Sequence, residues 1–292
     1  MIKKVLLTGT LITFILMVTG SALSQEDKIV QVAIDTFRAN VRLAEGTEIK
    51  FVEKKDAPIP DFYSVKLVVM LPDKEMPAIV YVDNKAERVF LGTLFIKGEN
   101  VTLKEAGAPK PRKIDIGILD AEKSPSLGDK GAKVVIVEFS NFQCPHCMDS
   151  WIKLQNLIQK HPKEIRYIFK HLPFQSQGKT FELSEMAAAA QEVSNDAFWV
   201  VHDFFFTDEG QSTAMLDREA IKKKIEQLLK GKGFDVGMFQ SAFKTGKATK
   251  RVYDDMALGN KLRVTATPTK VVNGDLIVGS VPDDVLEKYL KK

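Results

Sequence analysis

The sequence predicts a protein of the α/β class, in which a small α+β domain precedes a larger α/β domain with an inserted helical block. Three observations predict this fold class. An apolar run at 133–139, a helical pattern at 144–160 and a strand-like run at 164–172 follow one another, which is typical of a parallel βαβ unit. Helical patterning continues over about 176–262. Two strand-like runs joined at residues 273–274 and a last helical segment close the chain.

Residues 1–24 have the pattern of a secretory signal peptide. Lys3 and Lys4 provide a positive start, an apolar run follows, and Ala22 and Ser24 are small residues at the positions that precede a cleavage site. The apolar run is shorter than the roughly 20 residues that a membrane-spanning helix needs, so cleavage is favoured over an anchor. We therefore expect the mature protein to be periplasmic or otherwise extracytoplasmic.

Residues 25–107 predict the small α+β domain. Apolar residues recur at helical spacing over residues 26–43. Strand-like runs separated by turn-forming sequences follow, at residues 48–53, 62–70, 78–83, 88–96 and 100–105. The segment holds no cysteine, no histidine and no evident catalytic cluster, so we expect it to serve in association or substrate binding.

A Pro- and Lys-rich stretch at 108–113 predicts a linker, and residues 114–292 predict the second domain. Residues 114–118 predict a short strand before the βαβ unit. The helical block reads as four or five helices. One of them carries an aromatic-rich segment around His202. Such a segment more often packs in the core of a helical domain than lines a peptide-binding groove, so we expect His202 to be structural.

Length and charge limit the possible functions. The 292 residues suffice for two domains. The formal net charge is +4, and no basic tract or aromatic–basic stripe indicates nucleic-acid binding. A structural zinc site needs four ligands. The chain has four histidines and no second cysteine pair, so we expect no metal and no cofactor.

Both cysteines of the chain, Cys144 and Cys147, lie three positions apart. A disulfide between them closes a loop around only two residues and removes little entropy from the unfolded chain, so it contributes little to the stability of the fold. Outside the cytoplasm an even cysteine count usually means structural disulfides. Here the spacing favours a redox pair that opens and closes.

The position of the pair predicts unequal roles. Cys144 is expected at the N-terminus of a helix, where unpaired N–H groups and the helix dipole favour a thiolate. Pro145 suits the first helical turn, and His146 adds a donor and, when protonated, a positive charge. Cys147 lies one turn further into the helix and is expected to be more buried. We expect Cys144 to form the mixed disulfide and Cys147 to resolve it.

A βαβ unit whose helix opens with Cys-Pro-His-Cys resembles the thioredoxin superfamily, and this motif in an exported protein resembles the DsbA-type thiol–disulfide oxidoreductases. The resemblance covers residues 114–292 and implies a thioredoxin-like domain with the helical block inserted. It implies that Glu138, six residues before Cys144, is the buried carboxylate that helps to move the proton of the second cysteine. It also implies that Thr267 and Pro268 form the cis-proline loop that faces the disulfide and the substrate.

Alternatives to these assignments stay open from the sequence. Glu138 could be a surface acid on an edge strand, and Pro268 could follow a trans bond, as most prolines do. Lys170 could pair with Glu138 from the neighbouring strand or could be an ordinary surface lysine.

The two-domain layout is similar to that of DsbC- and DsbG-type isomerases, which dimerise through an N-terminal domain. The expected function is an exported thiol–disulfide oxidoreductase that introduces disulfides into secreted proteins. The alternatives are a dimeric disulfide isomerase or reductase and, in another class, a periplasmic binding chaperone. The implied partners are unfolded or reduced secreted proteins, a membrane redox partner that is DsbB/VKOR-like or DsbD-like, and a second copy bound through residues 25–107.

Overall fold

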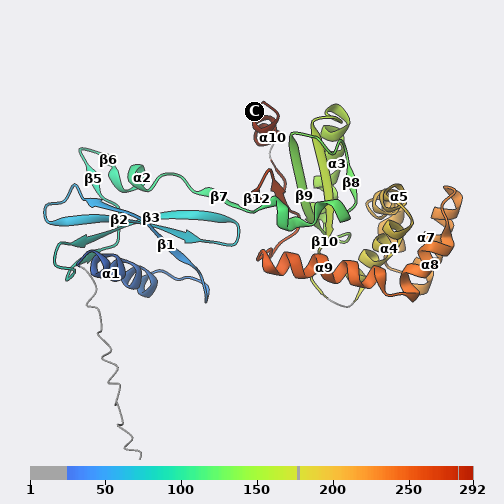
Figure 1. The fold of residues 1–292 in the computed structure, drawn as a ribbon, viewed down its shortest axis with the longest axis horizontal. Helices are drawn as coiled ribbons and strands as arrows, with labels where there is room; N and C mark the ends of the chain where they lie inside the picture. The colour runs from blue at the N-terminus through green and yellow to red at the C-terminus, as the bar shows by residue number, and fades with distance from the viewer. Residues whose placement is uncertain (1–24, 176–177, 282, 292) are drawn as a thin grey trace, which may run out of the picture. The chain divides into compact units, whose positions relative to one another are not determined.

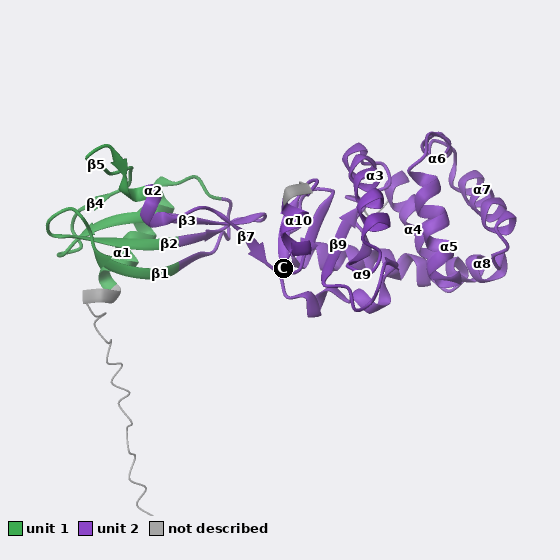
Figure 2. Ribbon diagram, turned by 90° about the horizontal axis from the view of Figure 1, so that it is seen from above, with its two compact units in different colours: residues 1–43, 51–67, 79–102 green, residues 44–50, 68–78, 103–292 purple. Residues whose placement is uncertain are grey.

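A computed structural model describes residues 25–175, 178–281 and 283–291 (Figure 1). The predicted signal peptide therefore lies outside the described residues. The chain divides into two compact units (Figure 2). One comprises residues 1–43, 51–67 and 79–102, and the other comprises residues 44–50, 68–78 and 103–292. Within the described residues, no helix combines the length and the apolar composition that a membrane crossing requires.

The first part of the chain has the helix and antiparallel strands that its sequence predicts. Helix α1 (Gln25–Asn40) is followed by β1 (Ile49–Asp56), β2 (Phe62–Met70) and β3 (Lys74–Asp83), which lie side by side in this order. The short strand β4 (Val89–Phe90) pairs with β3. The helix and the sheet each bury an apolar face, and these faces form the core of this part of the chain. Its members include Ile29, Ala33, Val65, Leu67 and Val80.

Two predictions in this part are wrong. Residues 88–96 do not form one strand: β4 ends at Phe90, and β5 (Phe95–Ile96) pairs with β6 (Glu99–Asn100) in a separate hairpin. Residues 100–105, predicted as a strand, lie mostly in helix α2 (Val101–Ala106). Alternating apolar residues over six positions fit a helix turn as well as a strand. In the structure the Thr102 hydroxyl lies 2.9 Å from the Tyr81 hydroxyl, a tertiary contact that the local pattern does not reveal.

The second unit is built on a mixed sheet in the order β7, β12, β11, β9, β10, β8. The strands span β7 (Lys110–Lys113), β8 (Ser126–Leu127), β9 (Val134–Ser140), β10 (Ile165–His171), β11 (Thr269–Val272) and β12 (Asp275–Val278). Strands β9 and β10 are parallel and flank helix α3 (Pro145–Lys160) in the chain, which confirms the predicted βαβ unit. The other neighbouring pairs are antiparallel.

Two segments before the βαβ unit differ from the predictions. Residues 110–113, part of the predicted linker, form β7 and pair with β12. The predicted strand at 114–118 is instead the 3₁₀ helix η1 (Ile116–Leu119). The Asp115 side chain accepts a hydrogen bond from the Gly117 N–H at 2.8 Å. This local bond gives the backbone an alternative to a sheet ladder, which a short apolar pattern does not reveal.

Strand β9 is buried on both faces, as its continuous apolar run predicts. Val134 and Ile136 belong to the core under α3 and the helical block, whereas Val137 and Phe139 belong to a second core on the opposite face. Because successive side chains point to opposite faces, these two sets alternate along the strand. The strand that ends just before the cysteines is thus held by packing from both sides.

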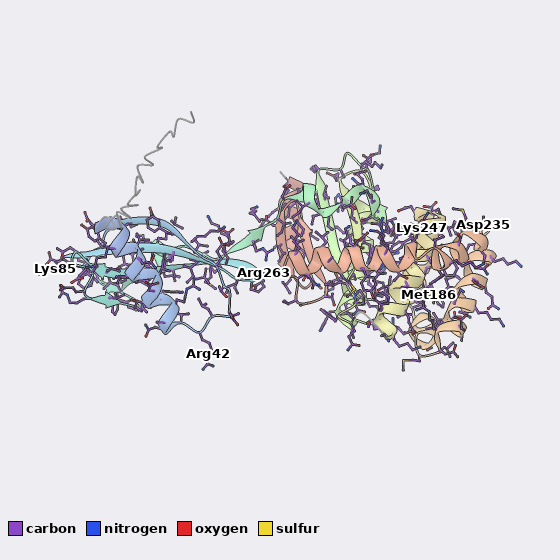
Figure 3. All side chains as sticks on the ribbon, turned by 60° about the horizontal axis from the view of Figure 1, so that its bottom comes forward. Arg42, Lys85, Met186, Asp235, Lys247 and Arg263 are labelled. Carbon is purple, nitrogen blue, oxygen red and sulfur yellow. The ribbon has the colours of Figure 1, made fainter. Side chains whose placement is uncertain are left out.

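The helical block comprises α4 (Lys179–Val193), α5 (Asn195–Phe205), α6 (Asp208–Thr213), α7 (Arg218–Gly231), α8 (Val236–Lys244) and α9 (Lys247–Lys261). Within the described residues the block has six helices, against the predicted four or five, and the additional one is the short helix α6, whose start is capped by the Thr207 hydroxyl. Ser194, Thr207, Asp217 and Asp235 each accept a backbone N–H at a helix start. Met186 lies inside the block, whereas Asp235 and Lys247 lie on its surface (Figure 3).

The end of the chain follows the prediction. Strands β11 and β12 form a hairpin whose turn residues, Asn273 and Gly274, have φ values of 46° and 89°. Positive φ at both central positions is the conformation that an Asn-Gly turn favours. Helix α10 (Asp283–Lys291) then completes the described chain.

Candidate active site

Cys144 lies where two loops meet. It is the N-cap residue of α3, with Pro145 in the first turn, and its side chain is partly exposed. Its Sγ is 3.3 Å from the carbonyl oxygen of Thr267, and the Thr267–Pro268 peptide bond is cis. The loop that leads into α3 and the loop that leads into β11 therefore converge on this sulfur. Pro145 and His146 lie on the exposed first turn of the helix.

The loop before Cys144 is held by Asn141. The Asn141 carbonyl oxygen accepts the Cys144 N–H at 3.1 Å, and its side-chain oxygen accepts the Gln143 N–H at 2.9 Å. Asn141 is buried at the end of β9. These bonds orient the backbone so that Cys144 begins the helix with an extended conformation, as an N-cap residue does.

Cys147 has a different environment. Its side chain is 0% exposed and lies in the core under α3. Burial, and next the negative charge of Glu138, raise the pKa of this thiol to about 12. Hydrogen bonds from Ser140 and from the Asn141 backbone act in the opposite direction and do not offset the burial. Both cysteines are free thiols in this structure.

Glu138 is buried beside the lysine of a neighbouring strand. It is 1% exposed on β9, which lies between β10 and β11, so the edge-strand alternative is wrong. Its Oε2 lies 3.2 Å from Nζ of Lys270, which is itself 2% exposed. Lys270 also donates to the Ser150 hydroxyl at 2.7 Å and to the Gly279 carbonyl oxygen at 3.2 Å.

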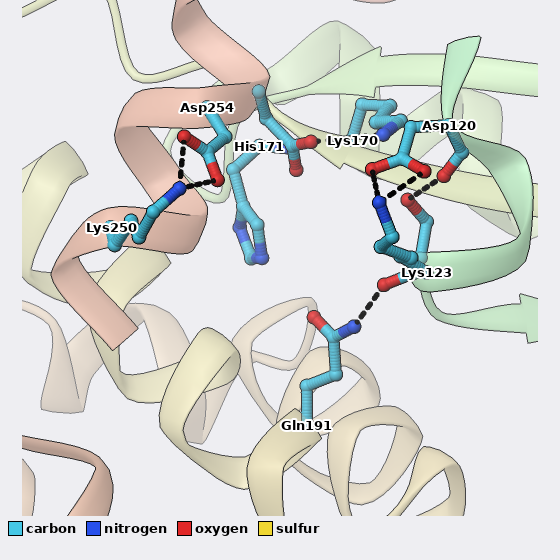
Figure 4. Close-up of polar contacts among 9 residues, drawn as sticks. Asp120, Lys123, Lys170, His171, Gln191, Lys250 and Asp254 are labelled. Atoms are coloured by element: carbon cyan, nitrogen blue, oxygen red, sulfur yellow. Dashed lines mark hydrogen bonds and ion pairs between the residues drawn. The ribbon is translucent and has the colours of Figure 1, made fainter. Parts of the chain in front are cut away.

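The alternative in which Lys170 pairs with Glu138 is wrong, and so is the alternative of a surface lysine. Lys170 is buried and its Nζ donates to Asp255 of α9 at 3.0 Å (Figure 4). The sheet register explains the difference. Lys170 is the partner of Phe139 in the ladder, whereas Lys270 is the partner of Glu138. Partners in a ladder share a face, so Lys170 points away from Glu138 and Lys270 points towards it.

Sequence reasoning missed three residues that surround Glu138 and Cys147: Lys270, Ser150 and Tyr167. Tyr167 is buried on β10, and its pKa is raised mainly by burial and then by the charges of Glu138 and Cys147. Ser150 lies three positions after Cys147, and this spacing places the two on one helix face. A lysine inside the apolar TKVV run, two residues after Pro268, was the available signal for Lys270.

The aromatic-rich segment packs as a core, as predicted. Phe198, His202 and Phe205 are all 0% exposed. The ring of His202 lies 4.6 Å from that of Trp151 on α3, so the helical block packs directly against the cysteine-bearing helix. Burial lowers the pKa of His202 and favours its neutral form, which is consistent with a structural residue.

No group of three or more histidine, cysteine, aspartate or glutamate side chains in the described parts of the chain is arranged to hold a metal ion. The groups that the described residues bring together at this site are two unequal sulfurs, a buried carboxylate and a buried amine.

Residues 120–292 match the protein family described as Thioredoxin. The "Probable disulfide bond formation protein D" of Bacillus anthracis is 30% identical over 175 residues, which cover 57% of this chain and 76% of that protein. The "Na(+)/H(+) antiporter NhaA 1" of Salinispora arenicola is 25% identical over 158 residues, which cover 53% of this chain and 22% of the antiporter. The chain thus spans less than a quarter of the antiporter's length.

Solved structures show the same fold. BdbD of Bacillus subtilis, in its oxidised form, superposes with a TM-score of 0.51 at 22% identity, over 63% of this chain and 98% of that chain. A thiol-disulfide exchange protein of Wolbachia pipientis superposes with a TM-score of 0.50 at 22% identity, over 59% of this chain and 88% of that chain. The family match extends over more than half of the residues, so the chain belongs to the thioredoxin family, and the 30% identity over 76% of the Bacillus anthracis protein places it among the relatives of disulfide bond formation protein D.

Proposed function

We propose that the chain is a protein thiol–disulfide oxidoreductase that works through Cys144 and Cys147. The observation that carries this proposal is the unequal environment of the two sulfurs. Cys144 is partly exposed at a helix N-terminus, whereas Cys147 is fully buried with a pKa of about 12. A purely structural disulfide would not need one solvent-accessible and one inaccessible sulfur.

The proposed chemistry follows from this asymmetry. A client thiolate attacks Sγ of Cys144 in the Cys144–Cys147 disulfide, and the bond between the two cysteines breaks. Cys147 leaves with the electron pair and takes up a proton, because its raised pKa favours the thiol. A second client thiolate then attacks the mixed disulfide, and Cys144 leaves as a thiolate that the helix N-terminus stabilises. The client gains a disulfide, and the two cysteines are left reduced.

The other site residues have supporting roles in this proposal. Pro145 and His146 form the first turn next to Cys144, where a protonated His146 would favour the thiolate. Glu138 lies in the core beside Cys147 and assists its proton transfer. Thr267 and Pro268 border Sγ of Cys144, so a client cysteine that reaches this sulfur passes their loop.

We favour an oxidase over an isomerase, since Cys144 lies at the N-terminus of α3, where the helix dipole favours an anion and therefore the release of the disulfide to a client. Within this proposal the protein is exported and acts on reduced secreted proteins. A membrane redox partner, DsbB/VKOR-like or DsbD-like, restores its active form. Residues 25–107 form the association or substrate-binding domain, which would hold a client or a second copy, and residues 108–113 connect it to the catalytic domain at 114–292.

The test is stoichiometric disulfide transfer from the oxidised full chain to a reduced, unfolded test protein without other oxidant. We expect one disulfide to be transferred per chain. Cys144→Ser should abolish transfer, and Cys147→Ser should accumulate a covalent adduct with the client. A Cys144→Ser variant that keeps its effect on client folding would instead indicate a binding chaperone. Recovery of a test protein with scrambled disulfides would indicate an isomerase.

A further inference from the structure

Ser140 is a buried serine whose hydroxyl lacks an ordinary partner. It is the last residue of β9 and is 1% exposed, and no nitrogen or oxygen atom in the described parts of the chain forms a hydrogen bond with its Oγ. The ring nitrogens of His171, its partner in the β10 ladder, do not do so either. A buried hydroxyl without a partner costs free energy, because its hydrogen bonds to water are lost on folding. It therefore calls for a functional explanation.

The strand places this hydroxyl under the cysteine-bearing helix. Residues two positions apart on a strand share a face, so Ser140 lies on the same face of β9 as Ile136 and Glu138. Ile136 belongs to the core that also contains Cys147, and Cys147 is 0% exposed. The hydroxyl of Ser140 acts on the Cys147 sulfur and lowers the pKa of that thiol. It thus faces the sulfur that must carry negative charge during thiol–disulfide exchange.

A second donor comes from the next residue, Asn141, which is 4% exposed. Its carbonyl oxygen accepts the Cys144 N–H at 3.1 Å, and its side-chain oxygen accepts the Gln143 N–H at 2.9 Å, so the segment is held at both groups. The backbone N–H of Asn141 donates towards the Cys147 sulfur and also lowers its pKa. A hydroxyl and an N–H from two consecutive residues therefore converge on one buried sulfur.

The other groups near this sulfur do not offer such stabilisation. Burial disfavours the thiolate of Cys147, and the negative charges of Glu138 and Cys144 disfavour it further. The titratable groups on the neighbouring elements are uncharged or engaged with Glu138: Tyr167 on β10, His202 on α5 and Lys270 on β11. The two donors at the end of β9 act in the opposite direction.

We propose that Ser140 is a catalytic residue whose hydroxyl, together with the N–H of Asn141, stabilises the negative charge on Cys147 whenever the Cys144–Cys147 bond opens or closes. This inference rests on the function proposed above. Donors that are fixed in place before charge develops need no reorganisation during the reaction. A hydrogen bond in a buried site is also electrostatically stronger than one in water.

The step is balanced without a proton from Ser140. A client thiolate attacks Sγ of Cys144, the bond from the client to Cys144 forms, and the Cys144–Cys147 bond breaks. Cys147 leaves with the electron pair, and the Ser140 hydroxyl donates a hydrogen bond to this thiolate and keeps its own proton. In the reverse direction the Cys147 thiol first loses its proton to solvent. Its sulfur then attacks Cys144, and the client leaves as a thiolate with the electron pair.

The test uses the reduced full chain and the chromogenic disulfide of thionitrobenzoate. Reaction at Cys144 forms a thionitrobenzoate adduct, and attack by Cys147 then releases the coloured thiolate. This second step is followed by stopped flow across the pH range. We expect Ser140→Ala to slow it about tenfold at neutral pH and to move the midpoint of its pH profile upward by about one unit, which corresponds to a tenfold change. Ser140→Thr keeps the hydroxyl and should retain the wild-type midpoint.

The matched control is Ser184→Ala. Ser184 is also 1% exposed, but its hydroxyl donates to the Thr180 carbonyl oxygen at 2.9 Å within α4. Its loss should leave the pH profile of thionitrobenzoate release unchanged. Urea unfolding of the oxidised proteins checks the fold. Ser140→Ala should unfold at the wild-type midpoint, because no hydrogen bond to nitrogen or oxygen is lost.

The outcomes separate the two proposals. If the wild-type adduct releases no more thionitrobenzoate than that of Cys147→Ser, the proposed function itself fails. If the wild type releases it and Ser140→Ala shows the pH profile of Ser184→Ala, the function stands and the role of Ser140 is overturned. Failure of Ser140→Thr to restore the midpoint would assign the effect to packing and overturn it too. A Ser140→Ala chain that does not fold would show that the hydroxyl supports the structure, with the same consequence.

Discussion

Replacing His171 by phenylalanine should make the catalytic domain more resistant to acid. His171 is 0% exposed, and among the described residues neither of its ring nitrogens has a hydrogen-bond partner. Its ring lies 5.1 Å from that of Phe169 and 5.9 Å from that of Phe198 (Figure 4 shows its position). Burial, followed by the positive charges of Arg251, Lys170 and His202, lowers its pKa from 6.5 to about 3.

The sign and size of the effect follow from this shift. Between pH 6.5 and about 3 the unfolded chain binds a proton at His171 that the folded chain does not, so stability falls as the pH falls. Each pH unit in this window costs about 1.36 kcal/mol. From about pH 8 to about pH 4.5 the loss through His171 is roughly 3 kcal/mol, and His171→Phe should remove it.

The assay is urea unfolding of the reduced full chain at both pH values, followed by tryptophan fluorescence. The two tryptophans, Trp151 and Trp199, stack at 5.5 Å inside the catalytic domain, so they report on this unit alone. The comparison between the two pH values within each protein cancels any packing cost of the larger ring. If wild type and His171→Phe lose the same free energy of unfolding to within about 0.5 kcal/mol, the argument from burial is refuted.

Two further predictions concern buried contacts. Lys170→Met should lower the free energy of unfolding by about 3–5 kcal/mol, because it leaves the Asp255 carboxylate buried and unpaired. The control Lys250→Met breaks an exposed ion pair in the neighbouring turn of α9 and should change the free energy of unfolding by less than about 1 kcal/mol (Figure 4). Equal effects of the two variants in urea unfolding would contradict this prediction. Gly210→Ala should destabilise the domain by at least about 1–3 kcal/mol, since the added Cβ would lie 1.8 Å from a backbone carbonyl oxygen. Gly231→Ala, at a helix position with nothing within 4 Å, should not, and similar melting temperatures for the two variants would refute the clash.

Predictions from the sequence succeed where many consecutive residues favour the same local conformation. The apolar run of β9, the helix that begins at Pro145 and the Asn273–Gly274 turn each combine several neighbouring residues that favour one conformation, and all three are confirmed. They fail at residues 100–105 and 114–118, where about six residues fit a strand and a helical turn equally well. There a side-chain hydrogen bond or a tertiary contact selects the outcome.

The sequence by itself determined the βαβ unit, the position of Cys144 at a helix start and the depth of Cys147 one turn further on, because these depend on spacing along the chain. The tertiary structure alone decided which lysine lies beside Glu138. Lys170 and Lys270 both lie on strands next to β9, and the ladder register assigns Lys170 to Phe139 and Lys270 to Glu138. A shift of one residue reverses the face of every side chain on a strand, and register between strands so far apart in the chain is set by packing of the whole sheet.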